Sequence, residues 1–237
     1  MDAARREAIA RQYLPSRRHY YYALFKLATD PLYDAVASAL AGTDAPLLDL
    51  GCGVGLLAHV RNAAGLAMSY VGVDNDARKI ALATAAAERA ELAHTRFATA
   101  DLALGLPAHQ GSVAILDLLQ YLPPARVPAL IAEAGACVTA NGRLIIRSGL
   151  QAAGWRTGVT RTADRFARAV RWMNTAPRAY PTHESLLAQL AAQGLMAESR
   201  PLWGNTPFNN WLVLARRPQG PPSAGRAPPT PPAPAGR

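Results

Sequence analysis

Residues 46–148 alternate between short apolar runs and helical patterns, and this alternation constrains the fold more than any other feature of the sequence. The expected strands are residues 46–50, 69–74, 94–101, 112–119 and 142–148. Strands separated by helical patterns at this spacing form a parallel sheet joined by crossover helices. We therefore expect an α/β fold with a doubly wound, mostly parallel sheet.

Helices and strands are also expected on either side of this alternation. In the N-terminal segment Asp30 is placed to cap a helix, and Pro31 to occupy its first position. A helix is expected at 183–195, and the two strand patterns after it can pair as an antiparallel hairpin at the sheet edge. The expected domains are an N-terminal helical cap (1–44), a main domain (45–217) and a disordered tail rich in Pro, Ala and Gly (218–237).

Composition and charge limit the classes of protein to which this chain can belong. The chain has 237 residues, half of them hydrophobic, which is enough to bury a core. Its net charge of +9 favours anionic partners. Two cysteines, Cys52 and Cys137, provide neither a disulfide framework nor the spacing of a metal site. Because no secretory signal or membrane span is visible, the sequence predicts a cytoplasmic protein.

The stretch LLDLGCGVGLL, residues 47–57, places three glycines at alternating positions after the first expected strand. A dinucleotide loop needs a glycine where this chain has Leu56, and a phosphate-binding P-loop needs a lysine that is absent here. Asp49 precedes the loop; its carboxylate would repel a pyrophosphate but attract an ammonium group. The loop therefore predicts a ligand with a cationic amine.

Acidic or polar residues stand at the ends of the other expected strands as well. Asp74 ends the second strand, Asp101 follows the third, and Asp117 lies near the end of the fourth. The carboxyl ends of parallel strands meet at one edge of a sheet, where ligands bind. We expect these residues and the glycine loop to face one crevice.

In their order and spacing, these motifs resemble those of the class I S-adenosylmethionine-dependent methyltransferases. The resemblance implies a Rossmann-like, seven-stranded sheet, with S-adenosyl-L-methionine as the cofactor. It places Asp74 on the ribose hydroxyls, Asp101 on the adenine amino group and Leu102 beside the adenine ring. The cofactor-binding residues that it implies are Asp49, Gly51, Cys52, Gly53, Gly55, Asp74, Asn75, Asp101, Leu102 and Asp117.

Methyl transfer mainly requires that the protein align the methyl donor with the acceptor. A general base is needed only where the acceptor has a high pKa and must lose a proton. His183, at the start of a predicted helix, and Tyr121, after the fourth strand, are the candidate catalytic residues. The alternative for His183 is a purely structural place at the helix start. No metal site is expected.

The resemblance does not identify the methyl acceptor, so the remaining segments have to suggest one. Residues 143–181 hold eight arginines against a single acid, and TADRFARAVRWM within them has the pattern of a basic amphipathic helix. That helix suits an acidic carrier protein, an anionic membrane surface or RNA; the alternative is a solvated arginine face. The segment RRHYYYALFKL, residues 17–27, suits either base stacking or a wall for an apolar acceptor.

The sequence thus predicts a methyltransferase acting on a small-molecule, lipid-like or carrier-bound acceptor. Two alternatives stay open: an RNA methyltransferase, which the positive charge favours, and a non-catalytic protein of the same fold that serves as a partner subunit. The oligomeric state is not indicated by the sequence.

Overall fold

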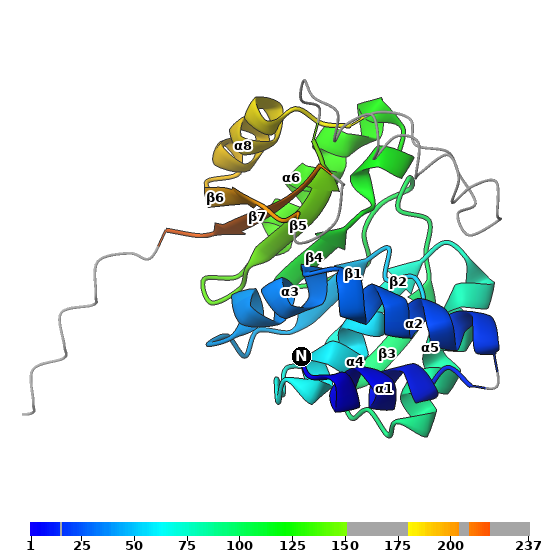
Figure 1. Cartoon of the computed structure of the whole chain (residues 1–237). Helices are drawn as coiled ribbons and strands as arrows, with labels where there is room; N and C mark the ends of the chain where they lie inside the picture. Colours follow the sequence, from blue (N-terminus) through cyan, green and yellow to red (C-terminus); the bar gives the residue numbers. More distant parts are fainter. Residues whose placement is uncertain (15, 151–179, 204–208, 219–237) are drawn as a thin grey trace, which may run out of the picture.

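The computed structural model describes residues 1–14, 16–150, 180–203 and 209–218, and all structural statements concern this part of the chain. It contains a seven-stranded sheet in the order β3-β2-β1-β4-β5-β7-β6 (Figure 1). The strands are β1 (Leu47–Leu50), β2 (Tyr70–Asp74), β3 (Thr95–Thr99), β4 (Ser112–Leu116), β5 (Leu144–Gly149), β6 (Met196–Pro201) and β7 (Asn210–Arg216). The first five are parallel, whereas β7 runs antiparallel to β5 and β6. The expected sheet with its edge hairpin is confirmed.

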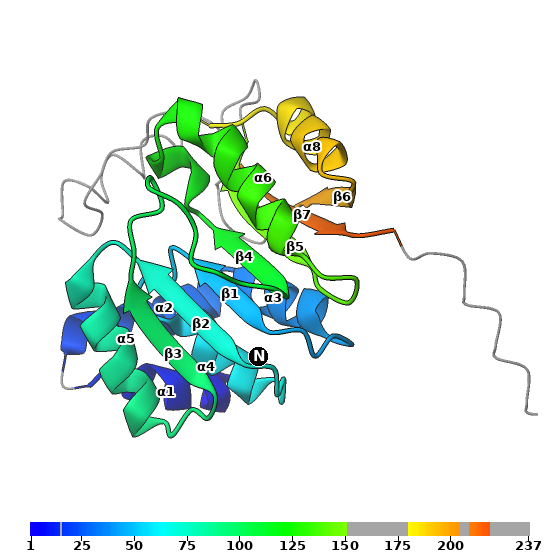
Figure 2. The same cartoon turned by 180° about the vertical axis from the view of Figure 1, so that it is seen from behind.

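Helices cover both faces of this sheet (Figures 1 and 2). The helices are α1 (Ala3–Arg11), α2 (Arg17–Thr29), α3 (Leu32–Leu40), α4 (Leu56–Ala63), α5 (Ala77–Arg89), α6 (Val127–Cys137) and α8 (His183–Ala192), with short 3-10 turns η1 (Leu119–Tyr121) and η2 (Pro124–Arg126). Helices α6 and α8 pack on one face; α3 and α4 pack on the other, with α5 beside α4. None of these helices is long and apolar enough to cross a membrane.

The central strands are buried on both faces, as parallel strands between helix layers must be. Within β1, Leu48 and Leu50 join the core under α6, while Leu47 joins the core under α3 and α4. Alternate residues of a strand point to opposite faces. Asp49 therefore lies on the same face as Leu47, within β1.

Helices α1 and α2 of the N-terminal segment pack outside the α4–α5 layer. Asp30 accepts a hydrogen bond from the backbone N–H of Leu32, the first residue of α3, at 3.0 Å. Pro31 is the N-cap residue of α3 and so stands one residue before the helix instead of at its first position. Tyr13 is fully buried, and its hydroxyl donates to the carbonyl of Val54 at 2.9 Å. This bond joins the N-terminal helices to the glycine loop.

We predict that Tyr13→Phe lowers the free energy of unfolding by about 1–3 kcal/mol, because it leaves the buried carbonyl of Val54 without its donor. Urea denaturation measures this loss. Tyr21→Phe is the matched control: Tyr21 is 63% exposed, and removal of its hydroxyl should change the stability by less than about 0.5 kcal/mol. Equal effects of the two substitutions would contradict a stabilising role for the Tyr13 bond.

Candidate functional site

The glycine loop leaves β1 and is fastened to the neighbouring strand β2 by its backbone. The N–H groups of Gly51 and Cys52 both donate to the carbonyl of Val73, at 2.8 and 2.9 Å. Gly51, Gly53 and Gly55 have φ angles of 75°, 57° and 79°. Side chains rarely adopt this left-handed region, so the alternating glycines allow the sharp turn from β1 into α4.

The space beside each of these glycines is different. A Cβ atom at Gly55 would lie 2.7 Å from the ring of Phe97, and one at Gly51 would lie 3.0 Å from the side chain of Leu118. At Gly53 no atom lies within 4 Å of that position. Within the loop, Gly53 is therefore the glycine beside open space.

Asp74 ends β2 and connects directly to the glycine loop. Its Oδ2 accepts a hydrogen bond from the N–H of Gly53 at 3.0 Å, and its Oδ1 accepts one from the N–H of Asp76 at 2.9 Å. The residue is 8% exposed. These two backbone hydrogen bonds fix the orientation of the Asp74 carboxyl group beside Gly53.

Asp49 has a different environment, although it lies on the adjacent strand. It is buried, its Oδ2 accepts a hydrogen bond from the hydroxyl of Tyr70 at 2.6 Å, and its Oδ1 has no hydrogen-bond partner among the described residues. Burial raises the pKa of Asp49 to about 7, although the bond from Tyr70 acts in the opposite direction. The sequence argument that took Asp49 as a full negative charge is therefore corrected: near neutral pH this carboxyl group is only partly ionised.

Four further residues of the expected cofactor site differ in how far they are exposed to solvent. Asn75 is exposed just after β2, and Asp101 is exposed with its Oδ1 accepting the N–H of Ala103 at 2.9 Å. Leu102 is buried in the core that includes α6. Burial raises the pKa of the Cys52 thiol well above its usual range, so Cys52 is a small residue of the turn and not a ready nucleophile.

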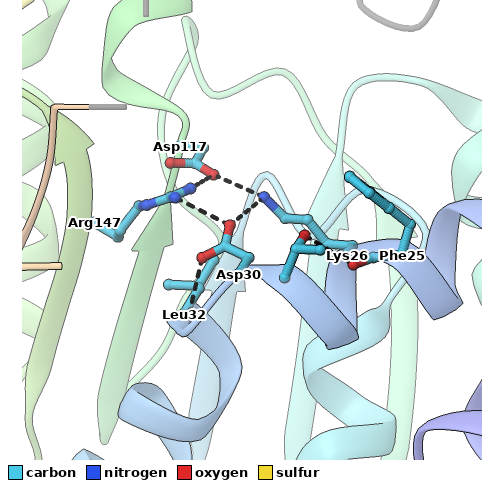
Figure 3. A network of polar contacts seen from close by, with 7 residues as sticks. Phe25, Lys26, Asp30, Leu32, Asp117 and Arg147 are labelled. Atoms are coloured by element: carbon cyan, nitrogen blue, oxygen red, sulfur yellow. Dashed lines mark hydrogen bonds and ion pairs between the residues drawn. The ribbon is translucent and has the colours of Figure 1, made fainter. Parts of the chain in front are cut away.

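Asp117, expected among the cofactor-binding residues, is held in a cluster of four charged side chains (Figure 3). Its Oδ2 pairs with the guanidinium of Arg147 from β5 and lies 3.7 Å from the ammonium of Lys26 from α2. The same two cations bind Oδ2 of Asp30, at 2.6 Å from Lys26 and 3.0 Å from Arg147. Two cations and two carboxylates thus join the N-terminal helices to the ends of β4 and β5.

The buried members of this charge cluster hold each other ionised. Burial opposes the charge of Lys26, but Asp117 and Asp30 keep its pKa above the usual value. Burial likewise opposes the charge of Asp30, and Lys26 and Arg147 keep its pKa low. Arg147 therefore does not belong to the basic surface expected for residues 143–181: its side chain is 4% exposed and paired on both sides.

The two candidate catalytic residues lie in different surroundings. His183 is the first residue of α8; its Nε2 lies 2.6 Å from Oγ of Ser199, and its ring centroid lies 5.2 Å from that of Trp211. These contacts place His183 against the edge hairpin. Tyr121 lies in η1, just beyond β4 and close in sequence to the charge cluster. A catalytic role for either residue stays a prediction.

Sequence reasoning missed four residues of this region. Tyr70 of β2 pairs with Leu47 of β1, so the two side chains point to the same face of the sheet. Asp49, two residues after Leu47, points to that face as well, which lets Tyr70 reach it. The strand register, which the sequence does not reveal, decides this contact. Arg147 did carry a signal: a charged residue inside an apolar strand needs a buried partner. Lys26 and Asp30, its partners in the charge cluster, lie more than a hundred positions earlier.

Some of the segments singled out in the sequence lie where the structure gives no description. The basic amphipathic helix expected in TADRFARAVRWM and most of the C-terminal tail lie outside the described residues. Within the described ranges, no group of three or more His, Cys, Asp or Glu side chains is arranged to hold a metal ion.

Comparison with known proteins relates this site to one domain family. Residues 47–142 match the model of a family described as a methyltransferase domain. The match covers the glycine loop, the ends of β1 to β4 and helix α6. No curated protein sequence matches this chain.

Solved structures share the fold at low sequence identity. A magnesium protoporphyrin IX methyltransferase from Synechocystis, crystallised with S-adenosylhomocysteine, is 20% identical with a TM-score of 0.61, over 79% of this chain and 82% of that one. An O-methyltransferase family protein from Burkholderia thailandensis is 17% identical with a TM-score of 0.67, over 89% of this chain and 63% of that one. A cyclase is 20% identical with a TM-score of 0.61, over 81% of each chain. The fold is therefore shared by proteins named for different reactions.

We predict that Gly55→Ala destabilises the protein by about 2–4 kcal/mol, because the new methyl group adds a clash with Phe97 to the cost of a left-handed φ. Gly65→Ala is the matched control, since Gly65 has a φ of 71° but open space around it. It should cost about 1 kcal/mol. In thermal or urea unfolding, Phe97→Leu should recover part of the Gly55→Ala loss. Equal losses at the two glycines would refute the packing argument.

We predict that Asp49→Asn removes a pH dependence of stability. The pKa of Asp49 rises from 3.8 in the unfolded chain to about 7 in the folded protein, so folding takes up a proton between these values. The stabilising contribution is complete below pH 3.8 and is lost as the pH rises through 7. Relative to the wild type, the variant should gain up to about 1.4 kcal/mol per pH unit across this window.

Urea unfolding at several pH values between 4 and 8 measures this difference. Asp44→Asn, at an exposed position, serves as the control and should show no such trend. A stability difference between Asp49→Asn and the wild type that does not vary with pH would contradict the raised pKa.

Proposed function

We propose that this chain is a class I S-adenosylmethionine-dependent methyltransferase, which transfers a methyl group from S-adenosyl-L-methionine to a small-molecule or lipid-like acceptor. The match of residues 47–142 to a methyltransferase-domain family supports this proposal. The observation that carries the proposal is the direct connection of Asp74 to Gly53, beside open space at the carboxyl ends of β1 and β2. Ligands of open α/β sheets bind at this edge.

The residues present suit this cofactor. A carboxylate offers about four lone-pair positions, and Asp74 uses two of them for the N–H groups of Gly53 and Asp76. The remaining two suit a pair of ribose hydroxyls. The Oδ1 of Asp49, buried without a partner among the described residues, suits the positive amine at the methionine end of the cofactor. Asn75 and Asp101, exposed after β2 and β3, extend the site toward the adenine.

When bound, S-adenosyl-L-methionine supplies an electrophilic methyl group that an acceptor lone pair displaces from the sulfonium. The work of the chain is then to position both molecules and to exclude water. Gly53, beside open space, lets the backbone approach the ligand, and Tyr13 fastens the N-terminal helices onto this loop. We propose His183 and Tyr121 as candidates for proton transfer from an acceptor that needs it.

The acceptor is proposed as a class and not as one compound. The N-terminal helices lie beside the charge cluster of Lys26, Asp30, Asp117 and Arg147, whose charges balance (Figure 3). Since its two cations are already paired, the cluster does not demand an anionic acceptor. This favours a neutral, lipid-like molecule, delivered free or on an acidic carrier protein.

The net charge of +9 favours a second candidate, an RNA methyltransferase. The cyclase of the same fold favours a third, a protein that keeps the fold without methyl transfer. The third candidate predicts no acceptor methylation even where the cofactor binds.

Calorimetry with S-adenosylhomocysteine tests the cofactor site in the full chain. We predict micromolar or tighter binding to the wild type, and affinity lowered about tenfold or more in Gly53→Ala, because a lost contact worth about 1.4 kcal/mol changes affinity tenfold. Gly65→Ala is the control, because Gly53 and Gly65 both have a left-handed φ and both face open space. It should lose stability like Gly53→Ala but keep its affinity. No heat with the wild type would overturn the proposal.

A further inference from the structure

One side of α2 presents large apolar side chains to solvent. Tyr21 is 63% exposed and Phe25 is 69% exposed, one helical turn apart. Leu14, which is 41% exposed, lines the same shallow groove between α1 and α2 as Tyr21. Only five large hydrophobic side chains of the described residues are exposed, and these three lie together. We call Leu14, Tyr21 and Phe25 the α2 patch.

The α2 patch stands apart from the other tyrosines and from the charge cluster. Tyr20 turns toward α1 and donates its hydroxyl to Glu7, at 2.8 Å, and Tyr22 packs into the core under α1 and α2. Lys26 points toward Asp30 and Asp117, while the ring of Phe25 takes no part in these contacts (Figure 3). The protein's own packing therefore uses Tyr20, Tyr22 and Lys26, but it leaves Tyr21 and Phe25 exposed.

Basic side chains border the α2 patch. Arg17 and Arg18, at the start of α2, are exposed, and the side chain of Arg11 on α1 is 67% exposed. Glu7, an acid that lines the same groove, accepts hydrogen bonds from Tyr20 and Arg11, so Arg17 and Arg18 carry the excess positive charge. The surroundings of the patch are thus positively charged and fit an anionic partner.

The shape and chemistry of the patch favour a lipid surface over RNA. Aromatic rings that bind RNA stack on successive bases, and the aliphatic Leu14 offers no ring for this. Aromatic and aliphatic side chains on a convex helix, bordered by arginines, are instead typical of helices that rest in the boundary between headgroups and acyl chains. Each basic residue near an anionic surface adds to this attraction.

We propose that the α2 patch, with Arg11, Arg17 and Arg18, docks the protein onto an anionic lipid surface. Leu14, Tyr21 and Phe25 enter the boundary between headgroups and acyl chains, and the arginines contact the lipid phosphates. Helix α2 carries both this patch and Lys26 of the charge cluster, so docking brings the surface close to the proposed acceptor side. The docking itself does not depend on methyl transfer.

Sedimentation of the full chain with lipid vesicles tests the proposal. We expect binding to vesicles of phosphatidylcholine and phosphatidylglycerol in equal parts, weak binding to pure phosphatidylcholine, and a decrease with added salt. The double variant Tyr21→Ser, Phe25→Ser should bind the mixed vesicles about tenfold less tightly. Leu104→Ser, Met196→Ser is the matched control: both residues are exposed apolar residues away from α2, and their loss should not change binding.

Several results would overturn this assignment. They are an absence of vesicle binding, vesicle binding that the Tyr21→Ser, Phe25→Ser variant retains, or an equal loss in the control variant. Binding of single-stranded RNA in place of vesicles, or a dimer that the α2 variant disperses, would assign the patch to another partner. The α2 variant should keep its calorimetric heat with S-adenosylhomocysteine, so failure of the cofactor proposal and failure of lipid docking give different results.

Discussion

The packing of Phe97 against Gly55 and Gly72 is the contact on which the geometry of the site depends. A Cβ atom at either glycine would come within 2.8 Å of the ring, so β3 reaches the glycine loop only because both side chains are missing. The loop is held from the other side by the carbonyl of Val73. These contacts fix the course of the loop. As a result, Gly53 lies beside open space and its N–H donates a hydrogen bond to Asp74.

Carboxyl groups in this small region differ in charge because their partners differ. Asp74 accepts two backbone hydrogen bonds, which fix its orientation. Asp49 has one tyrosine hydroxyl and no other partner among the described residues, and burial raises its pKa. Asp30 is ionised because Lys26 and Arg147 surround it. A cationic ligand beside Asp49 would favour the ionised form of that carboxyl group.

The N-terminal helices have two roles that follow from the two sides of α2. Its inner side carries Lys26 to the ends of β4 and β5, where two acids and two cations join the helical cap to the sheet. Its outer side exposes Tyr21 and Phe25. The same helix thus contributes to the charge cluster and carries the α2 patch, which would bring a docked lipid surface near the ends of β4 and β5.

The sequence by itself determined the parallel sheet, the edge hairpin, the position of the glycine loop and the acid at the end of β2. These features depend on local patterns: apolar runs, glycine spacing and residues at strand ends. Only the tertiary structure decided that Asp49 is buried against Tyr70, that Asp117 and Arg147 pair with Asp30 and Lys26, and that Tyr21 but not Tyr20 faces solvent. The physical reason is that burial and charge pairing depend on strand register and on contacts between residues far apart in the chain, which no local pattern specifies.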